Sequence, residues 1–217
     1  MIPQKNLSML ANRLASGKTR IPESVLERDY CISWFLAGLA GSAIQNKLVF
    51  KGGTALKKCY FGEYRFSEDL DFTSLNKTIT LNDIKSVLES QDFLEVKDEY
   101  VSKATIKIER LKYIGPLGLA NSLKVEIDYT QNVVLPARIL AYKNAWNVET
   151  KVNVMDIKEI CAEKIRAASE RARYRDFYDL KLLFDTARFD IGEIAELIGR
   201  KESRKLITQD SIFSNWK

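Results

Sequence analysis

The stretch FKGGTAL at residues 50–56, followed by RFSEDLDF at residues 65–72, decides how this chain of 217 residues is interpreted. The apolar run at 48–50 predicts a short buried strand, and the paired glycines after it predict a turn. Residues 54–60 then predict a short helix. A strand that ends in a glycine turn and enters a helix is a common place for a protein to bind phosphate.

The second stretch alternates between apolar and acidic residues. Leu70 and Phe72 have one parity, whereas Asp69 and Asp71 have the other. On a strand, both carboxylates therefore project from one face while the apolar pair enters the core. Two like charges about 7 Å apart along a strand repel each other unless a divalent cation neutralises them. We predict that Asp69 and Asp71 bind Mg²⁺ or Mn²⁺.

The glycine turn supplies the other half of this predicted site. Gly52 and Gly53 allow a ligand to approach the backbone, and Thr54 adds a hydroxyl donor. Arg65 either pairs with Glu68 or contacts phosphate. A phosphate cradle that faces a metal-binding carboxylate pair is what transfer of a nucleotide from an NTP requires.

The remaining pattern predicts an α+β fold. Helices are expected from Pro22 and over 81–89, and alternation predicts further strands over 93–101, 104–113 and 123–130. After Val154 the pattern is helical to the end. We therefore predict a mixed-sheet nucleotidyltransferase core with N-terminal helices over 1–154, and a C-terminal helical part over 155–217 that packs on the active-site cleft.

A third carboxylate could complete the metal site from a neighbouring strand. Glu126 and Asp128 share one face of the strand predicted over 123–130, so either residue could serve as this ligand. The alternative is that they form cross-strand pairs with Lys107 or Lys124.

Two charged residues of the helical part are further candidates. Lys164 lies near an apolar helix stripe, where a lysine either extends to the surface or contacts a ligand. Asp176 follows twelve positions later, which is about 18 Å along one straight helix. The two residues can meet only if the chain bends between Ala168 and Tyr174, as a helical hairpin would. Asp176 could instead complement a helix dipole, and Asp179 is an alternative candidate.

Composition excludes several classes of chemistry. The chain has no histidine, which rules out Ser-His-Asp hydrolysis and imidazole acid–base catalysis. Its three cysteines, Cys31, Cys59 and Cys161, are expected in the core and fit a reducing cytoplasm. The apolar run 31–44 is too short for a membrane span, which needs about 20 residues.

The net charge of +5 is mild, but arginines are concentrated between residues 166 and 175. They predict either a basic face for a polyanion or a solvated helix surface. Lys201, Arg204 and Lys205 form a second basic group.

The quoted stretches resemble a known family. GGT at 52–54 followed by DLD at 69–71 is similar to the first signature of the DNA polymerase β-type nucleotidyltransferases. The fuller run resembles the AbiEii/AbiGii toxins of bacterial abortive-infection systems, which are related to the MenT toxins. Three other stretches agree with that resemblance: ERDY at 27–30, EICAEKIR at 159–166 and RDFYDL at 175–180.

The resemblance implies an NTP-binding nucleotidyltransferase toxin that a separately encoded antitoxin neutralises. In the MenT branch it implies addition of nucleotides to the 3′ end of tRNA. It favours Glu126 as the third carboxylate, and it implies that Lys164 binds the triphosphate. The positions that match the family's proposed active-site residues are Thr54, Asp69, Asp71, Lys164 and Asp176.

We therefore predict a cytoplasmic, Mg²⁺-dependent enzyme that transfers a nucleoside monophosphate from an NTP to RNA, with the 3′ end of tRNA as the acceptor. The general base would be one of the carboxylates. One alternative is the same chemistry on a protein or small-molecule hydroxyl. Another is a nucleotide-binding regulator that catalyses nothing.

Overall fold

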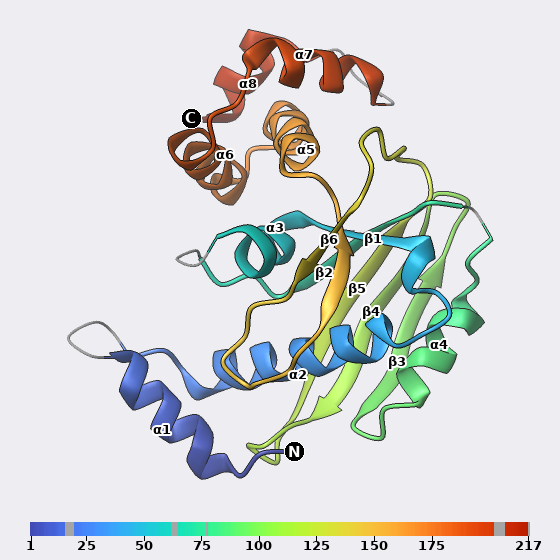
Figure 1. The fold of residues 1–217 in the computed structure, drawn as a ribbon, viewed down its shortest axis with the longest axis vertical. Coiled ribbons are helices and arrows are strands. Elements are labelled where there is room, and N and C mark those ends of the chain that lie inside the picture. The colour runs from blue at the N-terminus through green and yellow to red at the C-terminus, as the bar shows by residue number, and fades with distance from the viewer. Residues whose placement is uncertain (16–19, 62–64, 77, 202–206, 217) are drawn as a thin grey trace. The chain divides into compact units, whose positions relative to one another are not determined.

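A mixed sheet organises the N-terminal part of the chain (Figure 1). The structure, a computed structural model, describes residues 1–15, 20–61, 65–76, 78–201 and 207–216. Within those ranges the sheet has seven strands in the order β3-β4-β5-β2-β1-β7-β6. The strands are β1 (Leu48–Lys51), β2 (Asp69–Ser74), β3 (Leu94–Val101), β4 (Thr105–Ile114), β5 (Ala120–Asp128), β6 (Arg138–Ala141) and β7 (Lys151–Val154).

The chain divides into two compact units. The first, here called the sheet unit, comprises residues 1–129 and 139–154. The second, the helical unit, comprises residues 130–138 and 155–217. The helical unit thus includes a segment that precedes β6, in addition to the C-terminal helices.

One face of the sheet is apolar and covered by helices. Figure 1 shows α2 (Glu23–Ala40) lying across the strands, with α4 (Leu81–Glu89) beside it. Side chains of both helices line a small apolar cavity together with Phe72, and the rings of Phe35 and Phe72 are 6.4 Å apart. Burial of this apolar face is the main force that holds helices and sheet together.

Local signals explain where these helices begin. Pro22 stands at the N-cap of α2, one position before the first helical residue, where the sequence predicted it. Thr80 caps α4 through a capping box with Asp83. The predicted helix over 54–60 is present as α3 (Gly52–Ala55), which continues into a π-helical segment, η2 (Leu56–Tyr60).

The predicted strands of the sheet are all present. The sequence did not indicate α1 (Gln4–Ala15), the 3₁₀ turn η1 (Gln45–Lys47), β6 or β7. Both missed strands have four residues, too few for alternation to be recognised.

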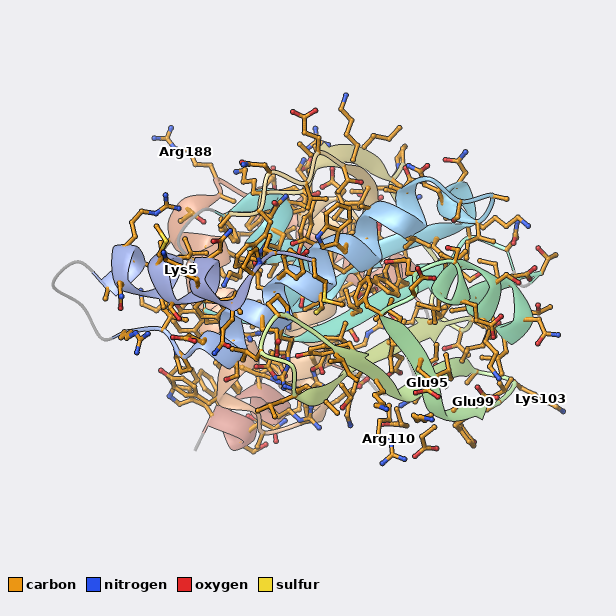
Figure 2. The ribbon with its side chains drawn as sticks, turned by 90° about the horizontal axis from the view of Figure 1, so that it is seen from below. Lys5, Glu95, Glu99, Lys103, Arg110 and Arg188 are labelled. Carbon is orange, nitrogen blue, oxygen red and sulfur yellow. The ribbon has the colours of Figure 1, made fainter. Side chains whose placement is uncertain are left out.

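Charged side chains occupy the β3 edge of the sheet. Glu95 and Glu99 of β3 are exposed there, as is Arg110 of the neighbouring β4, and all three are labelled in Figure 2. Such charges discourage pairing with another strand. None of the helices within the described ranges combines the length and the apolar character that a membrane crossing requires.

The helical unit is built around α5 (Ile157–Glu170). Around it pack α6 (Tyr174–Thr186), α7 (Ile191–Arg200) and α8 (Gln209–Trp216). Glu159 of α5 is fully buried and accepts the backbone N–H groups of Val134 and Leu135 at 2.9 and 3.0 Å. These bonds attach the segment 130–138 to α5.

Candidate functional site

The glycine turn between β1 and α3 brings the backbone beside a carboxylate. Gly52 has φ +79°, a conformation that favours glycine. A Cβ atom built on Gly52 would lie 2.4 Å from Oδ2 of Asp71. Position 52 therefore requires glycine for two reasons, its backbone conformation and its closeness to Asp71.

The segment before β2 packs against the next glycine. A Cβ atom on Gly53 would lie 2.8 Å from Nη2 of Arg65 and 2.9 Å from Oγ of Ser67. The Arg65 guanidinium thus lies beside the turn. Glu68 pairs with Arg28 of α2.

Thr54 connects the turn to the first carboxylate. Its side chain is buried, and its hydroxyl donates to the carbonyl oxygen of Asp69 at 2.6 Å. The Thr54 proton is therefore used within the protein, where it fixes the start of β2. Contacts at the turn and in β2 thus bring together Gly52, Gly53, Thr54, Arg65, Asp69 and Asp71.

Asp69 and Asp71 share one face of β2. Leu70 lies between them and is 0% exposed, and Phe72 follows Asp71 and is 2% exposed. Both aspartates, in contrast, are partly exposed. In the sheet, Asp71 is opposite Lys51 of β1 and Glu126 of β5. A row of charged residues therefore runs across this face.

The two candidates for a third ligand differ in position. Glu126 is beside Asp71, but its carboxylate also pairs with Lys107 at 3.2 Å, the cross-strand pair that the sequence offered as the alternative. Asp128 is opposite Thr73, two residues further along β5 than Glu126 and on the same face. No three metal-ligating side chains gather in the described part of the chain, so the third ligand stays a prediction.

The aspartate pair still fits a nucleotide-bound metal ion. Mg²⁺ is commonly held by one or two carboxylates together with substrate phosphates, rather than by a cage of protein ligands. Mn²⁺ accepts the same oxygen donors. Asp69 and Asp71 would supply the carboxylates, and the backbone of the partly exposed Gly52 lies beside Asp71, whereas Gly53 is buried under Arg65 and Ser67.

A second cluster of charges lies in the helical unit. The chain bends between α5 and α6, which is the condition under which Lys164 and Asp176 can meet, and the bend brings Lys164 Nζ to 3.0 Å from Asp176. Lys164 Nζ is also 2.8 Å from Asp179. Arg171 completes the cluster, with its Nε 2.8 Å from Asp176. Both aspartates are fully buried.

The cluster is compensated in charge. Burial raises the pKa of Asp176, but hydrogen bonds from Arg171 and the charge of Lys164 outweigh it, so the pKa is lowered. Lys164 is 9% exposed and is therefore not a surface lysine. The sequence did not indicate that Arg171 pairs with Asp176, because the bend that joins them has no local signature.

The basic groups of the helical unit only partly face solvent. Arg166 is 5% exposed and Lys201 is 2% exposed, so the expectation that both lie on a basic face is wrong. Lys201 instead pairs with Glu159 at 2.6 Å, because a buried carboxylate needs a counter-charge. Arg173 and Arg175 are exposed. Arg204 and Lys205 lie outside the described residues.

The cysteines have no chemical role in either cluster. Cys31, Cys59 and Cys161 are all free and buried, as predicted. Burial raises the pKa of both Cys59 and Cys161 to about 12, so neither thiol is a nucleophile at neutral pH. With no histidine in the chain, carboxylates and basic side chains must carry the chemistry.

Sequence comparison decides the family. Residues 34–212 match the family described as nucleotidyl transferase AbiEii toxin, type IV toxin–antitoxin system. The chain belongs to the AbiEii family. It is therefore a nucleotidyltransferase toxin, as the resemblance implied, and membership implies an NTP substrate and an antitoxin partner. None of the curated proteins matches the chain.

Solved structures share the AbiEii fold. MenT4, a nucleotidyltransferase toxin of Mycobacterium tuberculosis, superposes with a TM-score of 0.72 at 22% identity, over 97% of this chain and 77% of that chain. JHP933 of Helicobacter pylori has a TM-score of 0.59 at 23% identity, over 82% and 73% of the two chains. These similarities confirm the predicted α+β nucleotidyltransferase fold.

Proposed function

We propose that this AbiEii-family enzyme transfers a nucleoside monophosphate from an NTP to the 3′ end of tRNA, with Mg²⁺ or Mn²⁺. The observation that supports this most is the position of Asp71 beside Gly52. At this point a phosphate can approach the backbone while both carboxylates of β2 face the same side. A metal ion shared by phosphate and carboxylates, when bound, would polarise the reacting phosphate and stabilise the leaving pyrophosphate.

Each candidate site residue of the sheet unit has a role in this proposal. Asp69 and Asp71 would hold the metal ion, with Glu126, which is opposite Asp71 in the sheet, as a further carboxylate. The phosphates approach the backbone at the partly exposed Gly52, and the Arg65 guanidinium, which packs against the buried Gly53, binds them. Thr54 holds Asp69 in place through the 2.6 Å hydrogen bond to its carbonyl oxygen.

In the helical unit, Lys164 is proposed to bind the triphosphate. An ammonium group has three N–H donors, and Asp176 and Asp179 engage two of them. Asp176 has a lowered pKa and accepts hydrogen bonds from two cationic side chains, so it is a poor proton acceptor. We assign it the positioning of Lys164, which leaves the role of general base to a carboxylate of the sheet unit.

An exposed aromatic residue supports RNA as the acceptor. Tyr174 is 82% exposed and stands between the exposed Arg173 and Arg175. Aromatic rings that stack on bases, next to arginines that contact phosphates, are typical of single-stranded RNA binding.

The test is transfer of label from each NTP, labelled at the α-phosphate, to total tRNA in the presence of Mg²⁺ or Mn²⁺. We expect labelled tRNA with at least one NTP, and none with Asp69→Asn or Asp71→Asn. Asp98→Asn, on the exposed β3 edge, is the matched control. Periodate oxidation of the tRNA removes the 3′ diol and should abolish labelling.

Two outcomes contradict the proposal. Absence of label with every NTP and both metals argues against the reaction. Label on a protein or small molecule, but not on tRNA, keeps the chemistry and replaces the acceptor.

A further inference from the structure

The segment that leads into the carboxylate strand has no regular structure of its own. Residues 65–68 belong to no helix or strand, and Asp69 is the first residue of β2. Holding an irregular residue in a single conformation costs backbone entropy. Side-chain contacts must therefore fix this segment, and with it the position of Asp69.

Two of these contacts come from the glycine turn. Thr54 donates to the Asp69 carbonyl, and Ser67 packs against Gly53. The third comes from the opposite direction, where Glu68 forms an ion pair with Arg28 of α2. Arg28 also donates from Nη2 to Oδ1 of Asn121, the second residue of β5, at 3.2 Å. One guanidinium thus connects the entry of β2 to the neighbouring strand.

The residues on both sides of Arg28 make similar connections. Glu27 is 1% exposed and accepts the backbone N–H of Leu117, between β4 and β5, at 2.6 Å. Asp29 pairs with the buried Lys58, which lies in the η2 segment after the glycine turn, and accepts from Trp146 Nε1 at 3.0 Å. Helix α2 therefore holds both segments that carry the candidate site, the one after the glycines and the one before the carboxylates.

We propose that Arg28 is a positioning residue for the metal-binding carboxylates of β2. Its planar guanidinium contacts Glu68 and Asn121 simultaneously, and a lysine cannot reproduce that fork. This inference rests on the proposed function, because it gives Asp69 a metal-binding role. Arg28 precedes residues 34–212, which match the family.

The experiment measures binding before turnover. Calorimetry follows a non-hydrolysable NTP analogue, with Mn²⁺ and without it, in wild type, Arg28→Gln, Arg28→Lys and Glu68→Gln. We expect binding in the presence of Mn²⁺ to weaken about tenfold in Arg28→Gln, as is typical when a partner behind a metal ligand is lost. Arg28→Lys should fall between wild type and Arg28→Gln. Binding without Mn²⁺ should be unchanged.

Hydrogen exchange supplies a readout that needs no ligand. The backbone amides of residues 66–71 should exchange faster in Arg28→Gln and Glu68→Gln than in wild type. The matched control is Lys85→Ala, which removes another surface ion pair of the sheet unit, with Glu99 at 2.7 Å. Because Glu68 is about half exposed, Glu68→Gln is expected to fold even if Arg28→Gln does not.

The outcomes separate the two proposals. Unchanged exchange and unchanged Mn²⁺-dependent binding in Glu68→Gln and Arg28→Lys overturn the role of Arg28. A lower melting temperature with unchanged metal dependence also overturns it, since Arg28 would then be merely structural. If wild type binds no analogue with Mn²⁺, the proposed function fails, and the inference for the metal site fails with it, whatever exchange shows.

Discussion

The two charged clusters of this enzyme are built in opposite ways. In the sheet unit, Asp69 and Asp71 have the same charge, face one side of β2 and are partly exposed. In the helical unit, Asp176 and Asp179 are fully buried, and Lys164 lies within 3.0 Å of both. The first arrangement is suited to a cation from outside, whereas the second already contains its counter-charges.

This difference predicts how each cluster responds to mutation. Like charges near a surface repel each other. Removing one of them should therefore change the free energy of unfolding little but weaken metal binding strongly. Removing one member of a buried ion pair leaves an uncompensated charge, which strongly destabilises the fold. Activity and stability should therefore separate in the sheet unit and fall together in the helical unit.

The largest effect is expected for Asp71→Asn. Loss of a metal ligand removes several kcal/mol of transition-state stabilisation, which corresponds to about a thousandfold loss of transfer rate. The free energy of unfolding should stay within about 0.5 kcal/mol of wild type, because the site is partly exposed. Initial rates of labelling and urea unfolding measure the two quantities. A variant that loses stability in proportion to activity would contradict the comparison.

In the helical unit, Lys164→Met should lower the free energy of unfolding by about 3 kcal/mol, because Asp179 and Asp176 remain buried. Urea unfolding measures this. Adding Asp179→Asn to Lys164→Met should restore part of the stability, since it removes one of the stranded charges. Lys181→Met, which breaks an exposed pair with Asp185, is the control and should leave stability unchanged. Equal stability of the two lysine variants would show that the buried cluster is not what holds the helical hairpin.

The glycine turn gives the third prediction. Gly52→Ala should lower the free energy of unfolding by about 2 kcal/mol, because Ala must adopt φ +79° and its Cβ would meet Asp71. Gly118→Ala separates these causes: Gly118 also has a positive φ, +72°, but nothing lies within 4 Å of its Cβ position. We expect a loss of about 1 kcal/mol there and full transfer activity. Equal losses in both variants would mean that contact with Asp71 contributes nothing.

Local patterns in the sequence predicted the features of the candidate site whose geometry is set by neighbouring residues. Strand parity placed Asp69 and Asp71 on one face, and the paired glycines predicted the turn beside them. In both, residues close in sequence decide the geometry. The spacing of Lys164 and Asp176 showed only that the two residues cannot meet on one straight helix, so that a shared site would require a bend between them.

The features that the sequence did not indicate depend on distant residues. Arg28 meets Glu68 across 40 positions, and Lys201 meets Glu159 across 42. No spacing rule connects such partners, because only the packed fold brings them together. The strand β7 likewise owes its place to pairing with β1, through Phe50 and Val154, rather than to its own short pattern.

The smallest effect concerns the pH dependence of the helical unit. Because the pKa of Asp176 is lowered in the folded state, its charge stabilises the fold above the ordinary carboxyl pKa of about 3.9, and this contribution is lost as the pH falls through the lower, folded-state pKa. The difference in unfolding free energy between wild type and Asp176→Asn should therefore be constant between pH 5 and 7 and shrink below about pH 4. Urea unfolding across that range measures it. A difference that grows in acid would show that burial, rather than Arg171 and Lys164, governs the pKa of Asp176.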